Sequence, residues 1–508
     1  MHRFFPLVLT LGAVCLAAAT LESQQSTPFD VLIQNGRVMD GSGNPWIRGD
    51  IGIRGDRIVA VGSLRGATAT RVIDAVDRLV TPGFIDVHSH AGEGLTRPPL
   101  RQGQPLLAQG ITTIVANPDG GGPVDLVAQR SAFEKSGVGP NVALLIGHGA
   151  VRRSVLGAAN RAPSSDELQR MRDLVRRGMD AGAYGLSSGL FYTPGSFATT
   201  EEVIELAKIA GERGGVYTSH VRDEGNYNIG VVAAVQEVIR IAEEGKLIGI
   251  VSHMKALGPD NWGLTFAATQ RIEDARARGI QVFADQYPYE ASSTGLSAAL
   301  VPGGVEPTLE IVRENLRRRG GPRAVQIAFH KADPSLEGKT LETIARDRGV
   351  TPEQAALGLI ERGGASIVSF NMSEQDIANV MGKPYTMTSS DGGLVLPTEG
   401  KPHPRNNGAF ARKLAVYVRD RGTVGLEFAI RSMTSLPAAV FGFTDRGVIR
   451  PGAIADIVIF DPARVRDRAT YTDPHQLAEG MSYVIVNGIV VLDAGKWTDA
   501  LPGKVLRH

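Results

Sequence analysis

In the stretch Pro82-Gly83-Phe84-Ile85-Asp86-Val87-His88-Ser89-His90, a short apolar run leads directly into two histidines. The apolar run predicts a buried strand. His88 and His90 are two residues apart, so on an extended strand both imidazoles project from one face, where two nitrogens can bind one metal ion. Taken alone the pair is weak evidence, because histidine pairs also occur as ordinary surface or core residues.

Seven further apolar runs follow at intervals and alternate with helical stretches such as Ser165 to Ala181 and Thr200 to Arg213. Together with the first run, Gly83 to His88, the predicted strands are Thr112 to Asn117, Val142 to Gly147, Ala183 to Ser188, Val216 to His220, Leu247 to His253, Gln281 to Tyr287 and Tyr385 to Ser390. Eight parallel strands with helical crossovers predict an α/β protein with a (β/α)₈ TIM barrel. An open doubly wound sheet is the alternative, but its glycine-rich phosphate fingerprint is missing after the first strand.

Both ends of the chain carry a different, β-rich pattern, which predicts one small β-sandwich domain built from residues 28–82 and 441–508. The barrel is then expected over residues 83–440. A long stretch at about 303–382, which contains the strand-like run Ala324 to Phe329, is expected to be an insertion before the last barrel strand that covers the site as a lid.

Residues 1–22 are typical of a secretory signal peptide: Arg3 precedes an apolar run from Phe4 to Ala19 that ends in small residues. This predicts a periplasmic or secreted protein that has no membrane contact after cleavage. The only cysteine, Cys15, would be removed with the peptide, so disulfides and thiolate metal sites are excluded from the mature chain.

The charge balance argues against nucleic acid as a partner. Lys+Arg number 54 and Asp+Glu 53, for a net charge of +1. Nucleic-acid binding requires a basic face that neutralises phosphates, and no Lys/Arg run supplies one. A small-molecule substrate is the expected partner, and the sequence leaves the oligomeric state open.

Polar residues cluster at the predicted carboxyl ends of the strands, which is where TIM-barrel enzymes carry their chemistry. They are His88, His90, Asp119, His148, His220, His253, Asp285 and Asp391. Imidazole and carboxylate ligands without thiolate favour zinc over manganese, cobalt or nickel.

Such an ion lowers the pKa of bound water and polarises a carbonyl, and a nearby carboxylate must then move the proton. Asp391, at the end of the last strand, is the predicted general acid/base, although aspartate is equally apt as a helix cap there. The expected reaction is hydrolysis of an amide or ester.

The first stretch, together with Gly447-Val448-Ile449-Arg450-Pro451-Gly452-Ala453-Ile454-Ala455-Asp456, resembles the amidohydrolase superfamily. The stretches Ser187 to Tyr192, Thr218 to Gly225 and Ser252 to Lys255 are similar to its D-aminoacylase branch, the N-acyl-D-amino-acid deacylases. The resemblance runs from about Phe29 to the C-terminus. It implies a metal-dependent hydrolase that converts an N-acyl-D-amino acid to a carboxylic acid and a free D-amino acid.

The resemblance also implies ligands for one or two zinc ions. One ion would be held by His220 and His253, the second position would be formed by His88 and His90, and Asp391 would be the general acid/base. Asp119 stands where the branch commonly has a bridging cysteine and is predicted to be a ligand in its place. The carboxylated lysine of other relatives is excluded, since residues 183–190 contain no lysine.

A D-amino acid needs a cation or hydrogen-bond donors for its α-carboxylate. The residues at strand ends that offer these groups are Lys255, Tyr192, Arg222, Tyr287, Tyr289 and Ser292. The resemblance supports Lys255 and one tyrosine of the pair Tyr287 and Tyr289. His148 is expected beside the metal site rather than among its ligands.

Two alternatives stay open at this point. The same metal chemistry serves a dipeptidase for D-residues or a cyclic-amide hydrolase of the same superfamily. A barrel without activity that serves as a scaffold is a third possibility, although a scaffold has no physical need for converging metal ligands.

Overall fold

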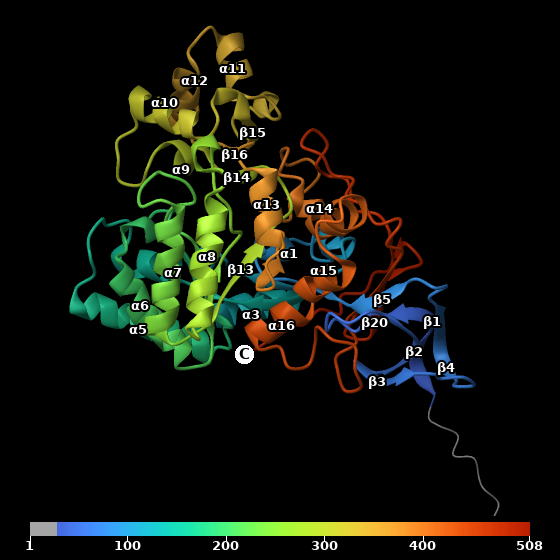
Figure 1. Ribbon diagram of the computed structural model, residues 1–508. Helices are drawn as coiled ribbons and strands as arrows, with labels where there is room; N and C mark the ends of the chain where they lie inside the picture. The colour runs from blue at the N-terminus through green and yellow to red at the C-terminus, as the bar shows by residue number, and fades with distance from the viewer. Residues whose placement is uncertain (1–27) are drawn as a thin grey trace, which may run out of the picture.

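The computed structural model describes residues 28–508, so the predicted signal peptide and Cys15 lie outside the described residues. The chain folds into three regions: a central barrel, a β-sheet at one side and an inserted unit above the barrel (Figure 1). Within residues 28–508, no helix is both long and apolar enough to cross a bilayer.

Eight parallel strands form the barrel, in the order in which they occur along the chain. The strands are β6 (Phe84–Asp86), β7 (Ile111–Ala116), β8 (Asn141–Leu144) continued by β9 (Ile146–Gly147), β10 (Gly185–Gly189), β11 (Val216–His220), β12 (Gly249–Val251), β13 (Val282–Gln286) and β17 (Thr386–Thr388). The first and last strands meet where the His90 backbone N–H donates to Gly392 O at 2.8 Å and the Asp391 N–H donates to His88 O at 2.9 Å. The predicted barrel is therefore confirmed, with each strand where the apolar runs placed it.

Gly83, just before the first barrel strand, lies where two neighbouring strands approach each other closely. A Cβ atom at this position would lie 2.1 Å from Thr112 Oγ1 on the neighbouring strand. Only glycine allows the two backbones to approach this closely.

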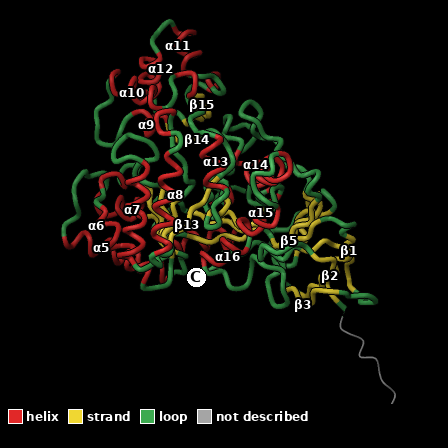
Figure 2. The backbone as a smooth tube through the Cα atoms, viewed as in Figure 1, coloured by secondary structure: helices red, strands yellow, loops and turns green. Residues whose placement is uncertain are grey.

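Helices cover the outside of the barrel strands (Figure 2). They are α1 (Gly92–Leu95), α2 (Gln104–Leu107), α3 (Leu126–Ser136), α4 (His148–Leu156), α5 (Ser165–Asp180), α6 (Thr200–Gly211), α7 (Val231–Gly245), α8 (Leu264–Ala277) and α13 (Glu374–Met381), with short 3₁₀ turns η1 (Gly195–Phe197) and η2 (Pro259–Asn261). The Thr199 hydroxyl caps α6 by accepting from Glu202 N at 3.2 Å.

The insertion has its own sheet and its own apolar core. Its strands β14 (Ser292–Gly295), β16 (Ser366–Ser369) and β15 (Val325–Phe329) form a three-stranded sheet in that order. Its helices are α9 (Leu296–Leu300), α10 (Leu309–Arg318), α11 (Leu341–Arg348) and α12 (Pro352–Glu361), with turns η3 (Pro322–Ala324) and η4 (Pro334–Leu336). The structure differs from the predicted limits of about 303 and 382: the three-stranded sheet of the insertion begins with β14, and α13, which lies inside the second limit, packs on α8 of the barrel.

Strands from both chain ends share one nine-stranded sheet. They are β1 (Phe29–Val38), β2 (Ile47–Arg54), β3 (Arg57–Gly62), β4 (Ala69–Asp74), β5 (Leu79–Pro82), β18 (Ile457–Phe460), β19 (Met481–Val486), β20 (Ile489–Asp493) and β21 (Lys496–Trp497). The two ends meet where β5 pairs with β18. The segment from barrel to sheet contains α14 (Arg405–Arg412), the π-helix η5 (Lys413–Asp420), α15 (Leu426–Met433) and α16 (Ser435–Phe441). The predicted sandwich and its domain boundaries stay predictions.

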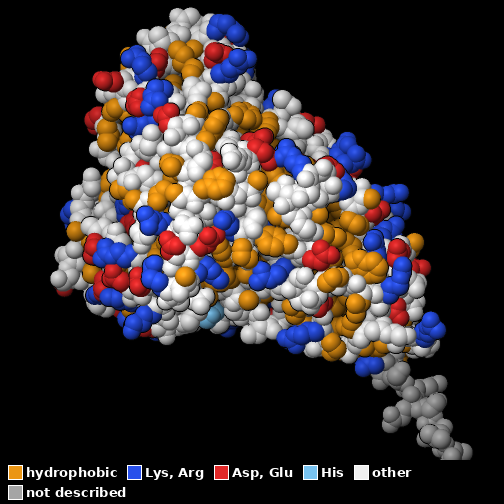
Figure 3. Space-filling view, in the orientation of Figure 1, with side chains coloured by type: hydrophobic (Ala, Val, Ile, Leu, Met, Phe, Trp, Pro, Cys, Tyr) orange, Lys and Arg blue, Asp and Glu red, His pale blue; other side chains and the backbone are white. Residues whose placement is uncertain are grey.

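Figure 3 shows charged side chains of both signs interspersed on the face in view. This distribution agrees with the small net charge of +1. No basic stripe of the kind that follows a phosphate backbone is visible on this face.

Asp456, just before β18, joins the sheet to the barrel. Its carboxylate is buried and accepts from Asn141 Nδ2 at 3.0 Å, from Asn487 N at 2.7 Å and from Arg446 Nη1 at 2.8 Å. We expect Asp456→Ala to lower the free energy of unfolding by about 3 kcal/mol, because it removes the buried counter-ion of Arg446 and leaves only the partly exposed Asp445. Denaturant unfolding measures the change.

Asp445→Ala is the matched control, since Asp445 is a partly exposed partner of the same guanidinium. It should cost less than about 1 kcal/mol. Equal losses in the two variants would contradict the role given to Asp456.

Candidate metal centre and active site

A cavity of about 1300 Å³ lies at the end of the barrel where the strands finish. Side chains that follow the barrel strands line it together with residues of the insertion, among them Arg319 and Phe329. Ligand pockets of barrel enzymes occur at this face, because the loops after the strands converge there.

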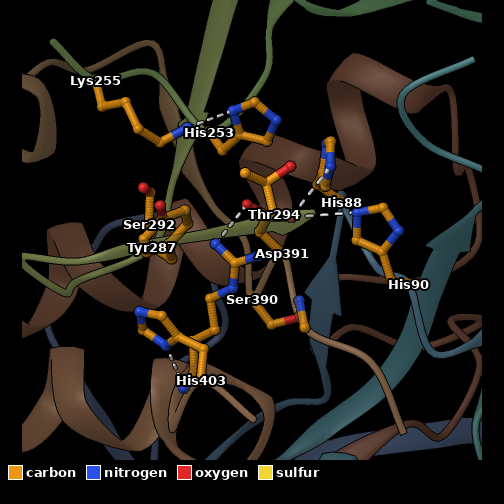
Figure 4. Close-up of polar contacts among 12 residues, drawn as sticks. His88, His90, His253, Lys255, Tyr287, Ser292, Thr294, Ser390, Asp391 and His403 are labelled. Carbon is orange, nitrogen blue, oxygen red and sulfur yellow. Dashed lines mark hydrogen bonds and ion pairs between the residues drawn. The ribbon is translucent and has the colours of Figure 1, made fainter. Parts of the chain in front are cut away.

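Four residues from three strand ends form the first polar cluster: His88, His90, Asp119 and Asp391. His88 Nε2 lies 3.3 Å from Asp119 Oδ1 and 3.6 Å from Asp391 Oδ1. His90 Nε2 lies 3.4 Å from Asp119 Oδ2 and 3.2 Å from Asp391 Oδ1. Figure 4 shows both imidazoles turned toward Asp391.

A second cluster shares Asp119 and adds His220 and His253. His220 Nδ1 and His253 Nε2 lie 3.0 Å apart, and Asp119 Oδ1 lies 3.5 Å from His253 Nε2. Asp119 Oδ2 is 3.9 Å from His220 Nδ1. The structure thus brings together all five predicted metal ligands, with the Asp119 carboxylate between the two histidine pairs.

The donor atoms of these clusters fit a divalent metal ion. Among the buried atoms without a hydrogen-bond partner in residues 28–508 are His88 Nε2 and Asp119 Oδ1. Buried polar atoms are rarely left unpaired. A metal ion between these two atoms would accept a lone pair from each. Imidazole nitrogen and carboxylate oxygen are the donor set that zinc prefers when thiolate is absent.

Three residues of these clusters have backbone conformations in the left-handed region. The φ angles are 56° at Asp119, 36° at His253 and 48° at Asp391. Non-glycine residues seldom adopt this conformation, and those that do gather at functional sites. The residue before Asp391 is held in place by Asp86, whose carboxylate accepts from Ser390 N at 2.8 Å and also from the Ser390 hydroxyl.

Charges within the cluster shift the pKa values of its members. Burial disfavours the charged form of His90, yet hydrogen bonds to Asp119 and Asp391 raise its pKa to about 9. Burial also opposes ionisation of Asp391, but the neighbouring Arg405 guanidinium holds the pKa of that carboxyl well below its usual range. Asp391 is therefore a carboxylate, able to accept a proton.

The sequence reasoning gave no role to Arg405 and Glu224. Arg405, at the start of α14, pairs with Asp391 through Nη1 and Oδ2 at 2.7 Å and lies 4.6 Å above the Tyr287 ring. Glu224 Oε1 lies 3.0 Å from His253 Nδ1 and 2.5 Å from Lys255 Nζ. Carboxylates behind a ligating histidine orient its ring, so Glu224 sets the direction of His253.

Four of the six predicted substrate-binding residues line the cavity. They are Lys255, Tyr192, Tyr287 and Ser292. The Tyr192 hydroxyl is 3.1 Å from Thr294 Oγ1. His148 lies apart from the clusters, with Nε2 3.0 Å from Glu202 Oε1, which agrees with its exclusion from the ligands.

The predictions for Arg222 and Tyr289 were wrong. Arg222 pairs with Glu237 on α7 at 2.8 Å, donates to the Ala198 carbonyl at 3.0 Å and does not line the cavity. Tyr289 is buried beneath the Arg412 guanidinium, 4.8 Å from its ring, and does not line the cavity.

A barrel whose strand ends converge on shared carboxylate and imidazole ligands defines a metal-dependent hydrolase. Residues 71–492 match the model of the Amidohydrolase family, and the chain belongs to this family. It is 36% identical to a D-aminoacylase and 35% identical to an N-acyl-D-glutamate deacylase, both from Alcaligenes xylosoxydans xylosoxydans. These alignments cover 96% and 94% of this chain and 99% and 97% of the relatives.

Solved structures agree with this assignment. The N-acyl-D-glutamate deacylase of Bordetella bronchiseptica, complexed with zinc and a phosphonate inhibitor, has a TM-score of 0.84 at 36% identity. That match covers 95% of this chain and all of the other. A D-aminoacylase crystal structure has the same TM-score at 35% identity, with the same coverage.

The shared position of Asp119 predicts that its removal affects both histidine pairs. We expect Asp119→Ala to lower the affinity for zinc by about 10- to 100-fold or more, because the carboxylate contributes to each cluster. Dialysis against buffered zinc followed by elemental analysis measures the bound metal.

Asp125→Ala serves as the control, since Asp125 only caps α3 by accepting from Ala128 N at 2.9 Å. It should bind zinc like the wild type. If Asp119→Ala retained the wild-type affinity for zinc, Asp119 would not be a metal ligand.

Proposed function

We propose that this chain hydrolyses N-acyl-D-amino acids to a carboxylic acid and a free D-amino acid, with zinc held by the clustered histidines and Asp119. The observation that carries the proposal is that one cavity contains both the His/Asp clusters and buried cations, among them Lys255 and Arg405. An amide carbonyl at the clusters and an α-carboxylate beside the cations are the two features that all such substrates share. The D-configuration rests on the relatives.

Zinc bound by these ligands would supply a Lewis acid that activates water and polarises the amide carbonyl. The protein must then move one proton from water to the leaving nitrogen. Asp391 is the group for this step: one of its oxygens is paired with Arg405, and the other faces His88 and His90. Because Arg405 favours the ionised form, Asp391 starts as the base and becomes the acid after it has accepted the proton.

The α-carboxylate is bound by cavity residues that the barrel strands present. Lys255 Nζ is held by Glu224 and lies 5.4 Å from the centre of the Tyr287 ring. Ser292 adds a hydroxyl from the first strand of the insertion. A carboxylate fixed here and a carbonyl fixed at the clusters orient the scissile bond before reaction, which contributes to the rate by proximity.

We also propose that the protein acts in the periplasm or outside the cell. The support is the pattern of residues 1–22, which lie outside the described residues. Expression of the full chain with fractionation tests the proposal, since loss of the first residues from the exported protein is the expected result.

The proposed reaction predicts a defined substrate and metal dependence. The mature chain should hydrolyse N-acetyl-D-amino acids at least about 100-fold faster in kcat/KM than their L-enantiomers. Chelation should abolish turnover, and added zinc should restore it, because the Lewis acid is lost and regained. Activity confined to dipeptides or cyclic amides would contradict the proposal, and a zinc-loaded protein inert toward all three classes would indicate a scaffold.

Asp391→Asn tests the proton transfer separately from metal binding. We expect kcat to fall by about 10³-fold, because the amide cannot accept the proton. The variant should retain zinc at the Asp119, His220 and His253 cluster. Full activity in Asp391→Asn, with its zinc content verified, would refute Asp391 as the general base.

A further inference from the structure

Arg319, which follows α10 in the insertion, is a buried cation in the wall of the cavity. Its side chain is only 2% exposed, and it lines the cavity with Lys255 and Ser292. Its hydrogen-bond acceptors are neutral: Nε donates to Ala299 O at 3.3 Å and Nη1 to Ser369 Oγ at 3.2 Å. The guanidinium also lies 5.8 Å from the Tyr227 ring centre.

Comparison with the other buried arginines shows what Arg319 lacks. Residues 28–508 contain four buried arginines, and the other three each pair with a buried carboxylate. These pairs are Arg405 with Asp391, Arg152 with Glu202, and Arg446 with Asp456. No carboxylate within the described part of the chain is paired with Arg319. Burying a charge without a counter-ion is costly, so an anion is expected to enter from the cavity.

The position of Arg319 relative to the substrate follows from Asn371. In the orientation that satisfies both ends of its amide, the Asn371 nitrogen donates to Ser292 Oγ at 3.1 Å and its oxygen accepts from Arg319 Nη1 at 3.2 Å. Arg319 and Ser292 thus share one amide. The two side chains are therefore neighbours in the cavity wall, close enough for one small molecule to contact both.

We propose that Arg319 binds a second carboxylate of the substrate, so that the enzyme prefers dicarboxylic N-acyl-D-amino acids. The proposal rests on the proposed function and specifies its substrate class. Lys255 and Arg405 are available for the α-carboxylate, and each already has a carboxylate partner in the protein. Arg319 has none and is the cation left for a second negative group. This group can belong to an acidic side chain or to a dicarboxylic acyl chain.

Matched substrates separate these sources. N-acetyl-D-glutamate and N-acetyl-D-glutamine have the same shape and differ in charge, while N-succinyl-D-leucine and N-acetyl-D-leucine place the difference in the acyl group. With the zinc-loaded mature chain, at least one charged substrate should exceed its neutral counterpart about 10-fold or more in kcat/KM. The pair that shows the difference identifies the source of the carboxylate.

Arg319→Met should lower kcat/KM for the preferred charged substrate by about 100-fold, mainly through KM, and change the neutral substrates by less than about 3-fold. Arg319→Lys should retain part of the preference. Arg317→Met is the matched control, because Arg317 is an exposed arginine in the last turn of α10, two residues before Arg319, and pairs with Asp260 at 2.9 Å. It should behave as wild type.

Two results would overturn the proposal: charged and neutral substrates turned over equally by the wild type, or equal losses for both in Arg319→Met. The first comparison needs no variant and decides the matter even if Arg319→Met fails to fold. Absence of turnover for every N-acyl-D-amino acid would instead refute the proposed function itself.

Discussion

The Asp119 carboxylate is the constraint on which the site depends, because it lies between two pairs of imidazoles that come from the ends of three different strands, β6, β11 and β12. Each of its oxygens is within 4 Å of a histidine nitrogen from each pair. A buried carboxylate surrounded by imidazoles needs hydrogen-bond donors or a cation to offset the cost of its desolvation. A divalent cation satisfies all the lone pairs at once and meets this need. The left-handed backbone at Asp119 is the local cost of placing the carboxylate there.

The barrel supplies the precision that such a site needs. Parallel strands end at one rim, so His88, His220 and His253 converge although they are far apart in sequence. Contacts behind the ligands then hold their orientation: Glu224 fixes the His253 ring, and Arg405 fixes one oxygen of Asp391. The insertion adds residues to the wall of the same cavity, among them Arg319 and Phe329.

The barrel and the residues of the His/Asp clusters could be predicted from sequence because both follow from local rules. Apolar runs at regular intervals locate the strands, and a polar residue after each run lies at the rim. Arg222 also follows a strand, but the direction of its long side chain is decided by Glu237 on α7, which no local pattern reveals. Arg405 lies on a helix after a long loop, and its contact with Asp391 exists only in the folded chain. Glu224 could have been found from the sequence, since it lies four residues after His220 in the stretch Thr218 to Gly225.

The central claim is that Asp119 takes the place of a metal-bridging ligand. Diffraction at the zinc absorption edge from crystals of the zinc-loaded protein tests it most directly, since anomalous scattering locates the metal independently of any assumed ligand. The account predicts zinc about 2.0–2.2 Å from an Asp119 oxygen, with imidazole nitrogens of at least one histidine pair completing the coordination. Zinc bound by the histidines with Asp119 more than about 4 Å away, or bound elsewhere in the chain, would contradict the account.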